Sequence, residues 1–191
     1  MRFQGKTILV TGAAGGIGSN LTTAFKAEGA LVAVTDLNTK GVEAAAAFDG
    51  DLTDRAFCDA LPQMVKDKLG SLDIVINNAG IITRGPLPEA SDNDIALSLA
   101  VNVEAPLRLC RASIPIMAKQ GGGTIVNTCS CWGLRPGPNH PIYVMTKAAL
   151  ASLTQCLGRD HAHQNIRVNA VCPNEVDTTM LRSGFEARGL D

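Results

Sequence analysis

Hydrophobic and polar positions along the chain fall into two alternating patterns. Short runs of valine, isoleucine, leucine and threonine, several of them apolar throughout, are typical of parallel strands that are buried on both faces. We predict strands at Thr7–Val10, Leu31–Thr35, Ile74–Asn77, Thr124–Thr128 and Ile166–Val171, and a weaker strand near Ala46–Phe48.

Longer stretches of helical character separate these runs. Ser91–Asp94 resembles a capping box at the start of one stretch, and Pro141 suits a first helical turn, where its missing N–H would be unpaired anyway. The alternation predicts an α/β protein in which helices cover both faces of a parallel sheet. The predicted helices are Ile17–Glu28, Thr53–Leu69, Asp92–Lys119 and Ile142–Gln164.

The size and composition of the chain fit one compact domain. Its 191 residues are 46% hydrophobic and 18% charged, which excludes a disordered chain and leaves too little length for two ordinary domains. A formal net charge of −1 gives no reason to expect nucleic acid or an anionic membrane as partner. No apolar run approaches the roughly 20 residues of a membrane helix. Met1–Gly5 leaves no room for a signal peptide, so we expect a cytoplasmic protein.

The six cysteines are scattered through the chain. Cys129 and Cys131 are one residue too close for a Cys-x-x-Cys motif, and no second pair is near enough to complete a zinc site. We therefore expect free thiols and no metal centre.

A glycine-rich turn, Thr11–Gly18, lies between the first predicted strand and the first predicted helix. Glycines let the backbone approach a pyrophosphate closely, and a helix N-terminus adds free N–H groups and the positive end of its dipole. The spacing Gly-x-x-x-Gly-x-Gly differs from the commonest dinucleotide fingerprint, and a tight structural turn is the alternative. The position between strand and helix favours nucleotide binding.

Asp36 stands at the end of the second predicted strand, 18 residues after Gly18. A carboxylate there can bind both ribose hydroxyls of NAD and repel the additional phosphate of NADP. The next residue is Leu37 and the nearest cation is Lys40, so no arginine is placed to receive that phosphate. Although an aspartate that only shapes a turn is the alternative, the sequence favours NAD.

Tyr143 and Lys147 lie one turn apart on the last predicted helix and therefore share a face. A free tyrosine, with a pKa of about 10, is a poor base at neutral pH, and a nearby ammonium lowers that pKa. An incidental surface pair is the alternative, but Tyr143 is the only tyrosine of the chain. We expect Tyr143 to exchange a proton during hydride transfer between a nicotinamide and an alcohol or ketone carbon.

Two further polar residues fall near this predicted site. Ser130 follows the strand Thr124–Thr128, at the sheet edge where ligands bind, and its hydroxyl could donate to a substrate oxygen or make only a local backbone bond. Asn102 lies inside the long third helix, where asparagine has poor propensity. It either holds water on a proton path toward Lys147 or makes a structural hydrogen bond, and the sequence leaves both open.

Taken together, these motifs resemble the short-chain dehydrogenase/reductase family over essentially the whole chain. Thr11–Gly18 matches the family's Thr-Gly-x-x-x-Gly-x-Gly turn. Asp51-Leu52 resembles the pair of residues that contacts the adenine in that family, and Asn77–Gly80 matches the family's Asn-Asn-Ala-Gly segment. The resemblance implies one NAD(P)-binding domain over residues 1–191 with a Rossmann-type, doubly wound parallel sheet in three layers. The cofactor-binding residues implied are Gly12, Ala14, Gly16, Ile17, Gly18, Asp36, Asp51, Leu52, Asn78, Ala79, Gly80, Tyr143, Lys147, Pro173, Val176 and Thr178.

The family's catalytic tetrad of Asn, Ser, Tyr and Lys falls on Asn102, Ser130, Tyr143 and Lys147. The resemblance implies that Ser130 orients the substrate and that Tyr143 exchanges the proton. It also implies that Lys147 lowers the tyrosine pKa and binds the nicotinamide ribose, while Asn102 anchors a water in the proton relay.

The resemblance extends into the last part of the chain, with two departures. In the family's Pro-Gly-x-Val-x-Thr stretch, Val176 and Thr178 would contact the nicotinamide carboxamide, but this chain has Asn174 in place of glycine. Asparagine is the least costly replacement if that position needs a positive φ, and with Glu175 it could instead shape the floor of the site. Family members usually continue past Asp191 with a last strand and an oligomer-forming helix. Either that part is disordered and absent from this sequence or this is a truncated form, and we favour the former. We expect the full-length protein to be a homotetramer or homodimer.

The leading hypothesis is an NAD-dependent dehydrogenase for a small polar alcohol such as a polyol, sugar derivative or hydroxy acid. One alternative is a 3-oxoacyl-carrier-protein reductase, which commonly prefers NADP and is disfavoured by Asp36. A non-catalytic NAD-binding protein is disfavoured because Tyr143 and Lys147 are both present. The polar residues expected around the substrate are Arg135, His140, Asn174, Glu175 and Arg182.

Overall fold

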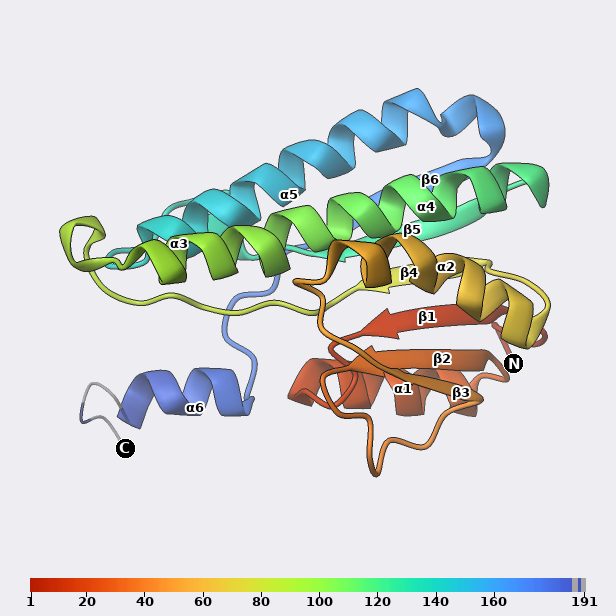
Figure 1. Cartoon of the computed structure of the whole chain (residues 1–191), viewed down its shortest axis with the longest axis horizontal. Coiled ribbons are helices and arrows are strands. Elements are labelled where there is room, and N and C mark those ends of the chain that lie inside the picture. Colours follow the sequence, from red (N-terminus) through yellow and green to blue (C-terminus); the bar gives the residue numbers. More distant parts are fainter. Residues whose placement is uncertain (187–188, 190–191) are drawn as a thin grey trace.

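The strands form one parallel sheet in the order β3-β2-β1-β4-β5-β6 (Figure 1). The structure, a computed structural model, describes residues 1–186 and 189. Residues 187–188 and 190–191, with which the expected domain ends, lie outside the described residues. The strands are β1 (Thr7–Thr11), β2 (Leu31–Asp36), β3 (Ala46–Asp49), β4 (Ile74–Asn77), β5 (Gly123–Thr128) and β6 (Ile166–Val171).

Helices cover both faces of this sheet. Figure 1 shows α2, α4 and α5 on one face and α1 on the other, which gives the three layers of a Rossmann-type fold and confirms the predicted fold class. Each predicted strand begins and ends within one residue of its predicted bounds. The helices are α1 (Gly16–Ala27), α2 (Arg55–Leu69), α3 (Asp92–Leu99), α4 (Ala105–Lys119), α5 (Pro141–Asp160) and α6 (Thr179–Glu186).

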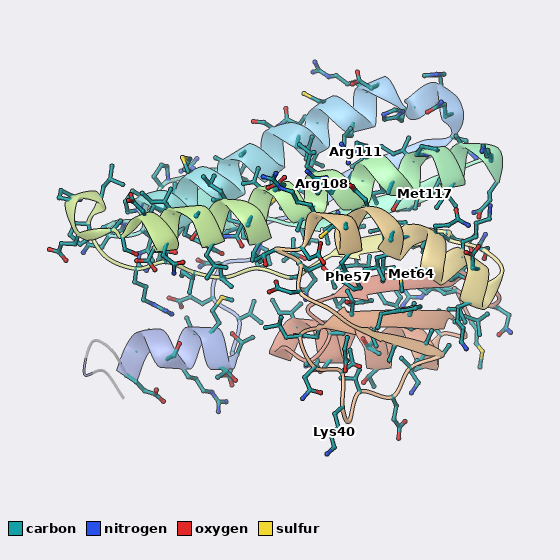
Figure 2. The ribbon with its side chains drawn as sticks, in the orientation of Figure 1. Lys40, Phe57, Met64, Arg108, Arg111 and Met117 are labelled. Carbon is teal, nitrogen blue, oxygen red and sulfur yellow. The ribbon has the colours of Figure 1, made fainter. Side chains whose placement is uncertain are left out.

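Alternate residues of the central strands supply the two halves of the core. Ile8 and Val10 of β1 face α1, whereas Leu9 between them packs into the cluster under α2 and α4. Met117 of α4 is fully buried in that second cluster. At the surface above it, Arg108 and Arg111 of α4 both donate to the carboxylate of Asp59 of α2, at 2.8 and 2.7 Å (Figure 2).

The third predicted helix, Asp92–Lys119, is not continuous as expected. A capping box at Ser91 begins it as predicted, but a π-helical turn, Ala100–Glu104, separates α3 from α4. Pro106 has no N–H to donate to the carbonyl of Asn102, four residues earlier, so the regular helical bond cannot form there. Interruptions of this kind are frequent at functional sites.

The other helices differ from prediction at their ends. Helix α2 begins at Arg55 because the side chain of Asp54 accepts from the N–H groups of Ala56 and Phe57. Helix α5 ends at Asp160, four residues before the predicted end. Helix α6 was not predicted. No helix within the described residues combines the length and apolar character needed to cross a bilayer.

Candidate active site

A crevice runs along the carboxyl ends of the strands, next to the point where β1 and β4 divide the two halves of the sheet. It consists of two cavities of about 430 and 510 Å³. We call the first the tyrosine cavity, since Tyr143 and Lys147 line it, and the second the glycine cavity, since the turn after β1 lines it. The residues that line both cavities are Ile17, Asn78, Gly80, Thr178 and Met180.

The glycine turn brings its backbone very close to the end of β4. Gly12 has a φ of +64°, and a Cβ there would lie 2.8 Å from the Cα of Ala79. A Cβ on Gly18 would collide with the carbonyl oxygen of Gly12. Gly15 precedes α1 without a capping side chain, so the N–H groups of the first helical turn remain available to a ligand.

The predicted cofactor residues converge on the two cavities, with one exception. Gly18 lines neither cavity among the described residues; its missing Cβ lets α1 begin tightly against the turn. Those that line the glycine cavity are Gly12, Ala14, Gly16, Ile17, Asp36, Asp51, Leu52, Asn78, Ala79, Gly80 and Thr178. Those that line the tyrosine cavity are Ile17, Asn78, Gly80, Tyr143, Lys147, Pro173, Val176 and Thr178.

The segment after β4 is fastened to the glycine turn by hydrogen bonds. The side-chain amide of Asn78 donates to the carbonyl of Thr11 at 3.0 Å and to that of Gly12 at 3.3 Å. In return, the Thr11 hydroxyl accepts from the N–H groups of Asn78 and Ala79, both at 3.0 Å. The two loops that face the crevice are therefore held as one unit.

Asp36 lies at the edge of the glycine cavity and already bonds the turn. One carboxylate oxygen accepts from the N–H of Ala14 at 2.9 Å and the other from the N–H of Leu37 at 2.8 Å. Each oxygen keeps a lone pair for a further donor. None of the described residues that line this cavity is a lysine or arginine, and the side chain of Lys40 extends away from the molecule (Figure 2).

Tyr143 and Lys147 lie on the same face of α5, as predicted. The Lys147 ammonium is 5.8 Å from the centre of the Tyr143 ring, and both side chains line the tyrosine cavity. The ammonium donates to the carbonyl of Thr128 at 2.8 Å, and this lysine is only 3% exposed. The end of β5 thus fixes the amine beside the phenol.

The expected lowering of the tyrosine pKa is wrong for this structure. Burial raises the pKa of Tyr143 above its usual value, opposed by a hydrogen bond with the hydroxyl of Ser130. Burial lowers the pKa of Lys147 to about 8. The low dielectric around both groups disfavours their charged forms, and this effect outweighs the attraction that the sequence argument assumed.

Ser130 is buried at the entrance to a short 3-10 turn, Cys131–Gly133, and lines the tyrosine cavity. Its hydroxyl oxygen accepts from the N–H of Trp132 at 3.2 Å, so the local backbone bond considered from the sequence is present. The hydroxyl proton is not used in that bond, and it points to the Tyr143 phenol, with which Ser130 is hydrogen-bonded.

Asn102 makes the structural hydrogen bonds that were one of its two predicted roles. Its amide oxygen accepts from the N–H of Ile81 at 2.9 Å, and its amide nitrogen donates to the carbonyl of Ile81 at 2.8 Å and to Thr146 at 3.1 Å. A Cβ on Gly80 would lie 3.0 Å from the Lys147 nitrogen and 3.2 Å from the Asn102 oxygen. The two polar atoms therefore face one small gap, which the glycine leaves open.

The residues around the far end of the tyrosine cavity differ in part from prediction. His140, Asn174 and Glu175 line it as expected. Arg135 and Arg182 are not among its described lining residues, and Arg182 instead pairs with Asp177 at 2.7 Å.

Arg84 and Trp132 line this cavity and were missed from the sequence. Arg84 lies on the loop that leaves β4 at the carboxyl edge of the sheet, but much farther from the strand end than Ser130 is from β5, so its position did not single it out. Its guanidinium donates to the carbonyl of Met180 at 2.7 Å and so joins this loop to α6.

Asn174, which replaces the family's glycine, does not adopt a positive φ. Its side-chain oxygen accepts from the Cys131 thiol at 3.2 Å. The substitution therefore places an amide on the cavity wall without straining the backbone. All six cysteines are free, as expected.

The chain matches the family model described as short chain dehydrogenase over residues 6–189. An uncharacterized oxidoreductase of Thermotoga maritima is 39% identical, over 98% of this chain and 78% of that protein. A sorbitol dehydrogenase of Cereibacter sphaeroides is 38% identical, over 93% of this chain and 73% of that protein. A 3-oxoacyl-carrier-protein reductase of Thermotoga maritima is 33% identical, over 94% and 78%.

Solved structures have the same fold. A crystal structure of a putative short-chain alcohol dehydrogenase from Sinorhizobium meliloti matches with a TM-score of 0.92 at 31% identity, over 98% of this chain and 79% of that one. A short chain dehydrogenase from Burkholderia cenocepacia, crystallised in complex with NADP, matches with a TM-score of 0.87 at 34% identity, over 94% and 78%. The chain therefore belongs to the short-chain dehydrogenase family of oxidoreductases.

Proposed function

We propose that this protein is an NAD(H)-dependent dehydrogenase that interconverts a secondary alcohol and a ketone on a small polar substrate. The observation that carries the proposal is the convergence of Ser130, Tyr143 and Lys147 on one cavity that continues into the glycine cavity. A phenol, a hydroxyl and an amine at the end of a dinucleotide-sized crevice suit proton exchange with a bound alcohol or ketone.

The residues of the glycine cavity fit a dinucleotide. Gly12 and Gly16 line this cavity beside the first turn of α1, which has no capping side chain and could receive a pyrophosphate. Asp51 and Leu52 would contact the adenine, while Val176 and Thr178 would contact the carboxamide. When bound, the nicotinamide supplies the hydride acceptor or donor.

The charge of this cavity favours NAD over NADP. Asp36 stands where the ribose hydroxyls would bind, and no lysine or arginine among the described residues lines the cavity to hold another phosphate. Since one structural neighbour was crystallised with NADP, both cofactors belong in any test.

Within the tyrosine cavity each polar side chain has a separate role in the proposed reaction. The Ser130 hydroxyl donates to the substrate oxygen and holds it beside Tyr143, whose phenol gives or takes the proton. Lys147 binds the ribose and stabilises the phenolate when it forms. Asn102 and Lys147 both face the gap at Gly80, which suits a water that returns the proton to solvent.

We favour a polyol, sugar derivative or hydroxy acid as the class of substrate. Arg84, His140, Asn174 and Glu175 place both signs of charge and several hydrogen-bonding groups around the cavity. The similarity to a sorbitol dehydrogenase supports this class. The similarity to a 3-oxoacyl-carrier-protein reductase keeps that reaction as the second candidate. We also propose that the protein is a cytoplasmic homo-oligomer.

The test is a steady-state screen of polyols, sugar acids and 3-oxoacyl thioesters with NAD(H) and NADP(H), run on the parent and on Tyr143→Phe. We expect turnover of a polyol-type substrate with NAD(H), and a loss of at least about a thousandfold in Tyr143→Phe, because the variant has no proton to exchange. NADH binding, measured by fluorescence, should stay within about threefold. Equal turnover by parent and variant would refute the role of Tyr143.

A further inference from the structure

His140 occupies a fixed position on the wall of the tyrosine cavity. It is the residue before the first turn of α5, with Pro141 after it, and its carbonyl accepts from the N–H of Val144 at 2.9 Å. Tyr143 follows three residues later on the same helix. The start of α5 therefore sets where the imidazole stands relative to the phenol.

The orientation of the imidazole is fixed as well. Nδ1 lies 2.7 Å from the carbonyl oxygen of Pro138, and since a carbonyl oxygen only accepts, Nδ1 carries the proton and donates. The ring packs against Trp132 with centroids 4.7 Å apart, and Trp132 also meets Tyr143 edge-on at 6.4 Å. Gly137 supports the indole closely, because a Cβ there would lie 2.5 Å from it.

These contacts leave the other ring nitrogen unused. No hydrogen bond from any residue that the structure describes reaches Nε2 of His140. With the proton on Nδ1, the Nε2 of the neutral imidazole is an acceptor. A hydroxyl group can donate a hydrogen bond to such an acceptor nitrogen. None of the steps derived for Ser130, Tyr143 and Lys147 uses Nε2 of His140.

We propose that His140 is a specificity-determining residue whose Nε2 binds a second hydroxyl of the substrate, close to the carbon that reacts beside Tyr143. The inference rests on the proposed function and narrows its substrate class to vicinal diols and hydroxyketones. A site built to bond a hydroxyl disfavours the analogue that lacks it, because the polar group of the protein then loses its partner.

The test compares NADH-linked reduction of acetoin and of butan-2-one, which differ by one hydroxyl. The parent should favour acetoin by about tenfold or more in kcat/KM, the effect of one net hydrogen bond. A glutamine side chain reaches the position of Nε2, and an asparagine only that of Nδ1. We therefore expect His140→Gln to keep the preference within about threefold, whereas His140→Asn and His140→Phe bring the ratio close to one.

His163→Asn is the matched control, since His163 is exposed on the turn after α5, and it should leave the ratio unchanged. An unchanged ratio in His140→Asn and His140→Phe would overturn the inference, as would a parent that shows no preference. If the parent reduced both ketones equally and lost that activity in Tyr143→Phe, the proposed function would stand and only the inference would fall. A parent that binds NADH but reduces no ketone or hydroxyketone would overturn both.

Discussion

At the scale of single residues, burial sets the direction of the pKa shifts of Tyr143 and Lys147 in the tyrosine cavity. Lys147 is 3% exposed, bonds a main-chain carbonyl and has a pKa lowered to about 8. The same desolvation raises the pKa of Tyr143. Helical spacing predicted that these two residues would be neighbours, but spacing carries no information on how much water surrounds them. The direction of the pKa shift was therefore the part that the sequence could not supply.

The shift of Lys147 predicts how stability depends on pH. Between about pH 8 and 10.5 the folded chain releases the Lys147 proton before the unfolded chain does, so the unfolded state binds more protons and stability rises with pH. Relative to Lys147→Met, the parent should gain roughly 3 kcal/mol in free energy of unfolding across this range. Urea unfolding of both proteins at several pH values measures this difference, and a difference that stays constant would contradict it.

Asp36 allows a second prediction, on cofactor choice. Asp36→Ala removes the charge that repels an additional phosphate, so the ratio of kcat/KM with NAD to that with NADP should fall by about tenfold or more. Lys40→Ala is the control, because the Lys40 side chain extends away from the molecule (Figure 2). If Asp36→Ala leaves the ratio as it is in the parent, Asp36 only shapes its turn through Ala14 and Leu37.

At the scale of elements, apolar runs predicted β1, β2 and β4 most clearly, because these strands are buried on both faces. Strands β3 and β6 are partly exposed, and β3 gave only a weak signal. The π-helical turn Ala100–Glu104 was not predictable in this way. Pro106 removes one regular helical bond there, and Asn102 of the turn pairs with Ile81, a residue 21 positions earlier in the chain. Helix α6, which has only eight residues, was missed.

The π-helical turn leads to a prediction about stability. Asn102→Ala leaves the N–H and the carbonyl of Ile81 without their partner, which should lower the free energy of unfolding by about 2–4 kcal/mol. Asn38→Ala, on an exposed loop, loses one solvent-exposed hydrogen bond from the N–H of Lys40 and should lower it by less than about 1 kcal/mol. Denaturant unfolding without any substrate isolates this effect from catalysis. A loss as small as that of Asn38→Ala would show that the turn does not depend on this side chain.

At the scale of the whole molecule, the sequence predicted a doubly wound parallel sheet but not the order of its strands. The glycine turn, the segment Asn77–Gly80 and Ser130 gather at one edge as expected. The outer wall of the tyrosine cavity was less predictable. It combines loops after β4 and β5 with the segment after β6, and side chains on three separate loops have no common sequence spacing. This is why Arg84 was missed and Arg135 was wrongly included.

Thr178 and Met180, just before and within helix α6, line both cavities and form a shared wall between them. Arg84, on the loop after β4, is hydrogen-bonded to the carbonyl of Met180 in this wall. If a ligand in one cavity orders this wall, the same ordering favours a ligand in the other cavity. The two binding free energies are then linked, and linkage is reciprocal. If a dinucleotide raises the affinity for a small molecule by some factor, that small molecule raises the affinity for the dinucleotide by the same factor. A single short helix would in this way make the two occupants of the crevice cooperative.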